Sequence, residues 1–244
     1  MRLAKAWTVT AKDFKTFTKR RTIVLYLVGF ELVVSIALPV IARYAGGRSK
    51  APAQVLPQFI NAFSLWFFIG AAVLPVSIAS YSLVGEKLQK SLEPLLAAPV
   101  SDDEVLVGKG LAALLPTLVA SYLGAVVFML LIDVFTAGRL GYRLYPNWTI
   151  GVILLLLVPL AALFSVSFNV LISARANDVR TAQQLGTLPI LPLFGLYILT
   201  EIGVVTLSAT NLLIIAGVLA AIDVVTLAAA LRTFRRDAIL TSWR

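Results

Sequence analysis

Six runs of about twenty mostly apolar residues divide this 244-residue chain and leave little room for any other kind of fold. A helix of about 20 such residues spans the hydrocarbon core of a bilayer. The expected spans are residues 22–42, 58–83, 105–132, 148–173, 185–206 and 212–231. Hydrophobic residues make up 59% of the chain and charged residues only 14%, which excludes an ordinary soluble domain. The sequence therefore predicts an all-α membrane protein with one transmembrane domain over residues 1–244.

Two residue types are absent from the chain. Without cysteine there is no disulfide, no catalytic thiolate and no iron–sulfur cluster. Without histidine the chain lacks imidazole ligands for metals and haem, and it lacks the commonest general base. We therefore expect no metal site and no cofactor in this chain, and the composition argues against a membrane-embedded metalloenzyme.

Residues 1–21 are strongly basic and carry several large apolar side chains. On a helix, Leu3, Trp7, Phe14 and Phe17 fall near one side with most lysines opposite, which is typical of an amphipathic helix lying in a membrane interface. The alternative is a basic flank that only fixes topology. Nucleic-acid binding is a poor explanation of these charges, because basic residues beside a span are expected from topology alone.

Lysine and arginine residues are distributed unequally between the two sides of the predicted bundle. Sixteen fall in the N-terminal segment, the loop between spans two and three, the loop near residue 175 and the C-terminal tail, against five in the other two loops. Because cytoplasmic loops carry the excess of positive charge, both termini are predicted to be cytoplasmic. The loop between spans two and three then faces the compartment that contains ATP.

The polar segment 84–104 lies between spans two and three and is the most charge-dense block of the chain. Leucines recur at helical spacing in its first half, which predicts a short amphipathic helix limited by Pro94 and Pro99. Ser101 followed by Glu104 predicts a capping box, so a new helix is expected to begin near Asp102.

The same segment resembles the cytoplasmic loop of the type-2 family of ATP-binding-cassette (ABC) transporter permeases. The resemblance rests on residues 81–87, 91–101 and 108–109. In that family the loop carries a coupling helix that docks on a separate ATPase subunit. The resemblance assigns this role to Glu86, Lys87, Leu88, Ser91, Leu92, Glu93, Pro94, Leu95, Leu96, Pro99 and Ser101. The alternative is a capped surface loop without a partner.

The resemblance also implies partners and a location. The chain has no phosphate-binding loop, since Gly108-Lys109-Gly110 lacks both the upstream glycine and the following hydroxyl residue, so ATP and Mg²⁺ are expected on the partner ATPase and this chain is expected not to be an enzyme. A second permease chain would complete the pathway. Arg175, Asp178 and Arg180 form a possible second contact for the ATPase. The expected location is the plasma membrane of a prokaryote, and the expected direction of transport is export.

Four polar residues within the spans are candidates for lining a transport pathway: Glu31, Asn169, Glu201 and Asp223. A charge at the centre of a bilayer costs about 2.5–3.5 kcal/mol on insertion scales, so the three carboxyl groups must be protonated, hydrogen-bonded or in contact with water. Glu201 is expected nearer the outside. The alternative is interhelical hydrogen bonding, with Asn169, Ser165, Ser167 or Asn211 as partners.

Two further functions remain open at this point. An ion- or proton-coupled secondary carrier would use Glu31 and Asp223 as coupling carboxylates, but such carriers more often show an inverted repeat, and none is clear here. The other is a membrane-bound enzyme, but the chain has no cluster of histidines or paired carboxylates expected on the cytosolic face, which a membrane-bound enzyme would need. Prolines in the first five spans predict kinks: Pro39, Pro75, Pro116, Pro159, Pro189 and Pro192.

Overall fold

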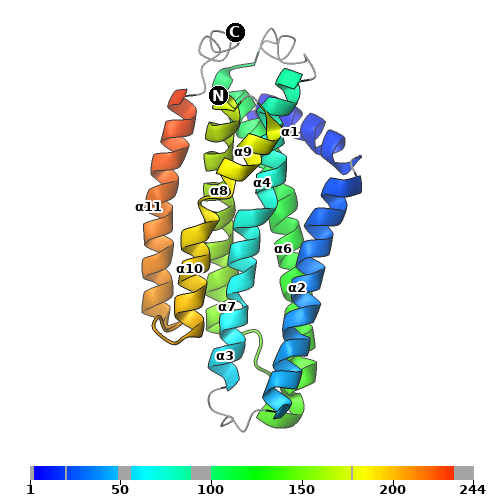
Figure 1. Ribbon diagram of the computed structural model, residues 1–244, viewed down its shortest axis with the longest axis vertical. Coiled ribbons are helices and arrows are strands. Elements are labelled where there is room, and N and C mark those ends of the chain that lie inside the picture. Colours follow the sequence, from blue (N-terminus) through cyan, green and yellow to red (C-terminus); the bar gives the residue numbers. More distant parts are fainter. Residues whose placement is uncertain (1–2, 20, 49–55, 89–99, 177, 234–244) are drawn as a thin grey trace.

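The computed structural model describes residues 3–19, 21–48, 56–88, 100–176 and 178–233, which form helices joined by short turns (Figure 1). No strand occurs within these ranges. The helices are α1 (Leu3–Thr18), α2 (Arg21–Arg48), α3 (Leu56–Phe63), α4 (Leu65–Leu88), α6 (Asp102–Leu140), α7 (Trp148–Val152), the π-helical turn η1 (Ile153–Leu157), α8 (Val158–Arg175), α9 (Val179–Gly186), α10 (Ile190–Glu201) and α11 (Ala209–Thr233).

Six helical segments in the described ranges are long and apolar enough to cross a membrane, which confirms the all-α fold with six spans. These segments run side by side along the long axis of the molecule, while α1 lies across one end (Figure 1). The C-terminal ends of α4 and α8 and the N-terminal end of α6 lie at that same end (Figure 1). We call it the α1 end.

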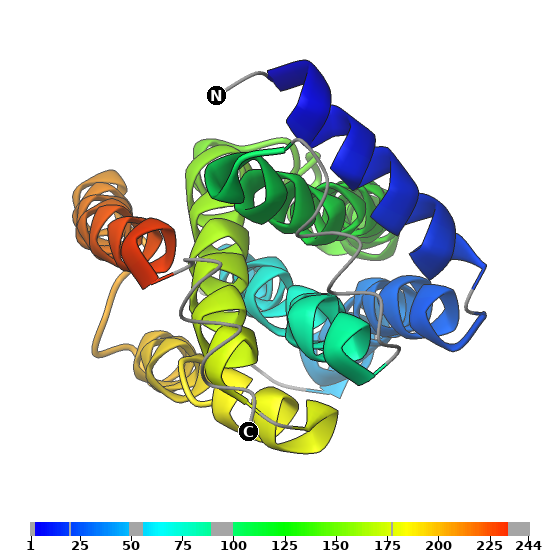
Figure 2. The ribbon, with the colours of Figure 1, turned by 90° about the horizontal axis from the view of Figure 1, so that it is seen from above.

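Helix α4 forms the centre of the bundle, and α10 and α11 form its periphery (Figure 2). In the span formed by α3 and α4, 83% of the most apolar stretch is buried inside the protein. The corresponding buried share is 11% for the span of α9 and α10 and 22% for α11. Aromatic side chains fill part of the core around α4, with the rings of Phe67 and Phe128 5.4 Å apart and edge-on. The outer faces of the peripheral helices are therefore exposed on the surface of the bundle, where they would contact lipid.

Helix α1 is fixed to α6 by a close backbone approach and a buried ion pair. A Cβ atom at Gly108 would lie 2.7 Å from both the carbonyl oxygen of Ala6 and the Cβ of Val9, so only glycine allows this contact. The hydroxyl of Thr10 donates to the carbonyl of Gly108 at 3.0 Å. Next to this contact, Lys109 Nζ lies 3.3 Å from Asp13 Oδ2, and both side chains are buried.

This arrangement adds detail that the sequence did not predict for residues 1–21. Phe17 is buried against the bundle, whereas Trp7 and Phe14 are exposed. One part of the apolar side of the helix therefore packs on the protein, and the other part remains on the surface. Lys109 was counted among the loop charges in the orientation argument, yet it is buried in α6 and paired with Asp13. Moving one residue out of the count leaves the charge asymmetry in place.

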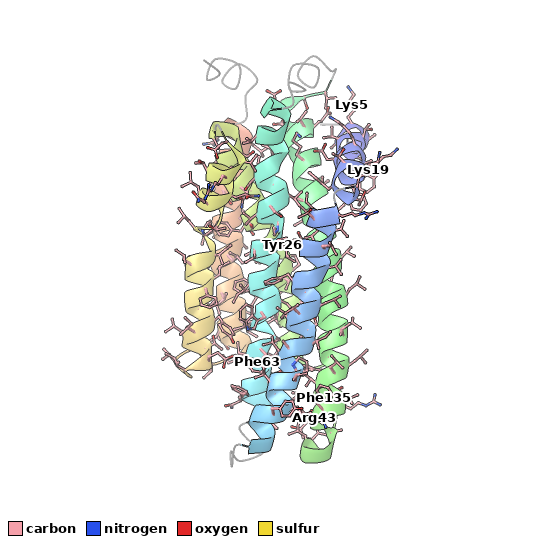
Figure 3. The ribbon with its side chains drawn as sticks, turned by 45° about the vertical axis from the view of Figure 1, so that its right-hand side comes forward. Lys5, Lys19, Tyr26, Arg43, Phe63 and Phe135 are labelled. Atoms are coloured by element: carbon pink, nitrogen blue, oxygen red, sulfur yellow. The ribbon has the colours of Figure 1, made fainter. Side chains whose placement is uncertain are left out.

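The opposite end is closed by contacts between α2, α6 and the turn after α6. Helix α6 continues beyond the predicted end of its span to Leu140 and stops at Gly141, whose φ is +72°. The carboxylate of Asp133 accepts from the backbone N–H groups of Leu144 and Tyr145, at 2.9 and 3.0 Å. Arg43 of α2 lies over the ring of Phe135 of α6, 5.1 Å from its centroid (Figure 3).

Three predicted spans contain interruptions: two lie beside Pro159 and Pro189, where kinks were predicted, and the third was not predicted. The second span breaks at Ser64, between α3 and α4. The fourth passes through the π-helical turn η1, which ends two residues before Pro159, a residue with no N–H to continue the α-helical pattern. The fifth, predicted over residues 185–206, instead runs from Val179 to Glu201 and breaks before Pro189, since proline restricts the residue that precedes it.

Candidate functional site: the α1 end and the buried carboxyl groups

The start of α6 at the α1 end is held by the predicted capping box. The N–H of Glu104 donates to Ser101 Oγ at 3.3 Å, and the N–H of Ser101 donates to Glu104 Oε2 at 3.0 Å. Asp102 and Asp103 add negative charge to the first turn, where the helix dipole favours it. The predicted helix start near Asp102 is therefore confirmed.

The residues assigned to ATPase coupling connect the end of α4 to this helix start. Glu86, Lys87 and Leu88 belong to the last turn of α4, at the α1 end. The remaining candidates lie outside the described residues, namely Ser91, Leu92, Glu93, Pro94, Leu95, Leu96 and Pro99. The two ends of the connecting segment are thus placed on neighbouring helices at one end of the bundle (Figure 1).

The possible second contact lies at the same end, where α8 passes into α9. Arg175 is the last residue of α8, and Arg180 is exposed on α9. Asp178 caps α9, since Thr181 donates to its carboxylate from both the hydroxyl, at 2.6 Å, and the backbone N–H, at 2.7 Å. These hydrogen bonds, first of all the one from the hydroxyl, hold the pKa of Asp178 below its usual value.

Asn169 holds three helices together beneath this end. Ser80 of α4 donates to Asn169 Oδ1 at 2.8 Å, and Asn169 Nδ2 donates to the carbonyls of Ser165, at 2.8 Å, and Gly186, at 3.3 Å. A Cβ at Gly186 would collide with the Asn169 amide, so the glycine allows α9 to pack here. Ser173 donates to the carbonyl of Ser80 at 3.0 Å. We call Ser80, Asn169, Ser173 and Gly186 the Asn169 network.

Glu31 of α2 inserts between α4 and α6 and is 2% exposed. Ser121 of α6 donates to Glu31 Oε1 at 2.7 Å, and Oε2 has no hydrogen-bond partner among the described residues. Two glycines make room for the carboxyl group: a Cβ at Gly70 would lie 2.9 Å from Oε1, and one at Gly124 would lie 3.2 Å from Oε2. The site is therefore built by three helices around one side chain.

Asp223 and Glu201 lie elsewhere. Asp223 of α11 is 3% exposed, and neither carboxyl oxygen has a hydrogen-bond partner in the described part of the chain. Helix α11 packs against α8, on the side of the bundle opposite to α2 (Figure 2). Glu201 ends α10, away from the α1 end, and lines a cavity of about 480 Å³ together with Asn61, Thr149 and other residues. The four candidates are thus not brought together within one chain.

Comparison with known proteins identifies the family. The family model described as ABC-2 family transporter protein matches residues 7–235, nearly the whole chain. The chain belongs to the ABC-2 transporter family. It is also 36% identical over 161 residues to the ABC transporter permease protein NatB of Bacillus subtilis (strain 168). That match covers 62% of this chain and 40% of NatB, so the chain spans less than half of that relative.

Membership in the ABC-2 family agrees with the six membrane-spanning segments and with the resemblance seen in the sequence. The chain is therefore a multi-pass membrane protein of the ABC-2 transporter family.

Sequence reasoning missed the partners that this ABC-2 permease gives to its buried polar groups. It proposed four partners for the carboxyl groups, and Glu31 instead uses Ser121, which lies 90 positions along the chain. Thr117, Ser121 and Gly124 form a row of small residues at helical spacing in the third span, a pattern typical of close helix packing in membranes. That row was the available signal. Asp13, the partner of Lys109, had no comparable signal.

Proposed function

We propose that this ABC-2 permease forms half of the transmembrane pathway of an exporter in a prokaryotic plasma membrane, paired with a second permease chain. A separate ATPase would carry ATP and Mg²⁺ and dock on residues 86–101, with Arg175, Asp178 and Arg180 as a second contact. Both termini would be cytoplasmic.

One observation carries the proposal: the segments proposed to touch the ATPase converge at the α1 end. The last turn of α4, the capped start of α6 and the link from α8 to α9 all lie there (Figure 1). The Asn169 network joins α4, α8 and α9 directly beneath them. Force applied at this end would therefore reach three helices together, as coupling of ATP hydrolysis to transport requires.

The charge distribution supports the same orientation. The described basic residues of α1 and the start of α2 lie at the α1 end (Figure 1). Without the buried Lys109, the sequence predicts fifteen lysines and arginines on this side against five on the other. The cytoplasmic side of a membrane protein carries such an excess. The ATPase, which needs cytoplasmic ATP, would meet the α1 end in this orientation.

Single-cysteine cross-linking tests the docking surface and the orientation together. Since the chain has no cysteine, each introduced thiol is unique. Ser91→Cys should cross-link to the ATPase through a thiol-reactive linker, and the matched control Ser208→Cys, at the opposite end beside the Glu201 cavity, should not. Tyr142→Cys should react with an impermeant thiol reagent added outside intact cells. Cross-linking from position 208, or labelling of position 91 from outside, would refute the proposed orientation.

A secondary carrier remains the second candidate function, because the carboxyl group of Asp223 is buried and has no described partner. Such a group could bind and release a proton during transport. Transport driven by an ion gradient in vesicles that lack any ATPase would support the carrier and exclude the ATP-driven permease.

A further inference from the structure

An apolar groove of about 590 Å³ lies between α1, α2 and α6 and has no role in the function proposed above. It faces outward, because the side chains that line it are largely exposed, with Trp7 at 59%, Val119 at 57% and Leu123 at 65%. The main lining side chains are Trp7, Phe14, Val24, Val28, Val119 and Leu123. In a membrane this groove must be filled by an apolar group.

The groove offers few hydrogen bonds to a polar solute, since its lining side chains carry only the indole N–H of Trp7 and two threonine hydroxyls. Its two threonine hydroxyls are already used within the chain, because Thr10 donates to the carbonyls of Ala6 and Gly108, and Thr18 donates to those of Phe14 and Lys15. The rest of the lining consists of aliphatic, aromatic and proline side chains. An acyl chain fits this lining, whereas a sugar, a nucleotide or a peptide with polar side chains does not.

The edge of the groove is basic. Lys15 and Lys19 directly follow the lining residues Phe14 and Thr18, and Arg21 begins α2; all three are exposed, and Lys19 lies beside the start of α2 (Figure 3). The one acidic residue among the first thirty, Asp13, points to Lys109 instead. Because α1 lies across the ends of α2 and α6, an acyl chain in the groove would have its headgroup near these cations.

From these observations we propose that the groove between α1, α2 and α6 binds an anionic phospholipid of the bilayer. One acyl chain lies against Trp7, Phe14 and Val119, and the phosphate lies near Lys15, Lys19 and Arg21. The lipid thereby fills the space between α1 and the two spans. This proposal needs only that the chain is embedded in a membrane, so it stands apart from ATPase docking and from the direction of transport.

Trp7 provides a direct probe of the occupant. The full chain, with Trp66, Trp148 and Trp243 each replaced by Phe, is reconstituted in phosphatidylcholine with brominated acyl chains, which quench a contacting indole. Unbrominated phosphatidylglycerol or phosphatidylcholine is then added in steps, and recovery of Trp7 fluorescence is measured. A basic residue near anionic lipid contributes about 1 kcal/mol, or about fivefold in affinity, so phosphatidylglycerol should restore fluorescence at a mole fraction at least about fivefold lower than phosphatidylcholine does.

Charge variants keep this test independent of folding. Lys15→Gln with Lys19→Gln replaces two exposed side chains and should remove most of the preference for phosphatidylglycerol. The matched control Arg232→Gln, an exposed residue in the last turn of α11, should retain it. Ala120→Phe, which fills the groove, should lower quenching of Trp7 by brominated lipid.

Three outcomes would overturn the proposal. Parallel recovery with both lipids would mean that the groove holds ordinary bilayer lipid without selection. Loss of the preference in Arg232→Gln as well as in the lysine variant would mean a general surface charge effect. Absence of quenching by any brominated lipid would mean that protein covers the groove, either from this chain or from a second copy.

Discussion

The Asn169 network and Asp223 are both buried polar sites within the spans, yet they differ in how their hydrogen-bonding groups are satisfied. Both ends of the Asn169 amide have partners on neighbouring helices or on its own helix. Neither oxygen of Asp223 has a described partner. A polar group in a bilayer is stable when it is hydrogen-bonded, so the first site stabilises the contacts between helices. At the second site both carboxyl oxygens are left without a hydrogen bond from the described residues.

The Asp13–Lys109 ion pair is a third buried polar site, at the junction between α1 and α6, and both of its groups have a partner. Breaking this ion pair should destabilise the protein more than the other changes described below. Lys109→Met leaves a buried carboxylate without its cation, which typically destabilises by about 3–5 kcal/mol. We expect α1 to become sensitive to protease and the midpoint of thermal unfolding in detergent to fall. Adding Asp13→Leu to Lys109→Met should recover most of the loss, because no uncompensated charge remains. Lack of recovery would mean that the pair is not the main link.

Asn169→Ala should have the next largest effect. It removes the hydrogen bonds to Ser80, Ser165 and Gly186, and in membranes such bonds contribute about 0.6–1.7 kcal/mol each, so a loss of about 2–5 kcal/mol is expected. The matched control is Asn211→Ala, because the side-chain amide of Asn211 donates to the carbonyl and hydroxyl of Thr206, five residues away, and joins no second helix through these bonds. If denaturant or thermal unfolding showed the same loss of stability for the two variants, the Asn169 network would contribute no more than a polar group at the edge of the bundle.

Asp223→Asn should leave stability unchanged or raise it by up to about 1 kcal/mol, since the wild-type carboxyl group carries an insertion penalty that no described bond offsets. The same variant should lower transport if Asp223 meets the solute or a proton. A clear fall in thermal stability would show that the carboxyl group of Asp223 is paired after all.

Asp178 should show the smallest effect and a defined pH dependence. Hydrogen bonds from Thr181 lower the pKa of Asp178 in the folded state, so its stabilising contribution is present above the unfolded pKa and is lost as pH falls through the folded pKa. Asp178→Ala should therefore slightly lower the midpoint of thermal unfolding near neutral pH and have no effect in strong acid. An effect that persists below that range would point to packing instead of capping.

The number of spans could be predicted from the sequence because each apolar run meets the length requirement of the bilayer independently of the others. The start of α6 could be predicted because the Ser101 capping box is local. The break at Ser64 carried no proline, and the contacts of Glu31 with Ser121 and of Lys109 with Asp13 join positions at least 90 residues apart. Such pairings depend on how the helices pack. The glycines at positions 70, 108 and 124 allow this close packing, but their positions in the sequence do not predict which residues meet there.

The roles of the four pathway candidates remain predictions, and the structure sharpens them. Glu31 belongs to α2 and Asp223 to α11, and these helices lie on opposite sides of the bundle, so the two carboxyl groups do not share one site within the chain (Figure 2). Asn169 is committed to contacts inside the chain. Glu201 borders the cavity away from the α1 end.

The measurement that tests the account most directly is capture of cytosolic ATPases by the detergent-solubilised permease in three forms: wild type, Leu92→Asp and Glu31→Gln. The account predicts that wild type and Glu31→Gln bind one ABC ATPase in stoichiometric amounts and that Leu92→Asp loses it, because only Leu92 belongs to the proposed docking segment. Equal loss in both variants would contradict this division between docking and pathway residues. Absence of any bound ATPase, with transport driven by an ion gradient alone, would contradict the ATP-driven function itself.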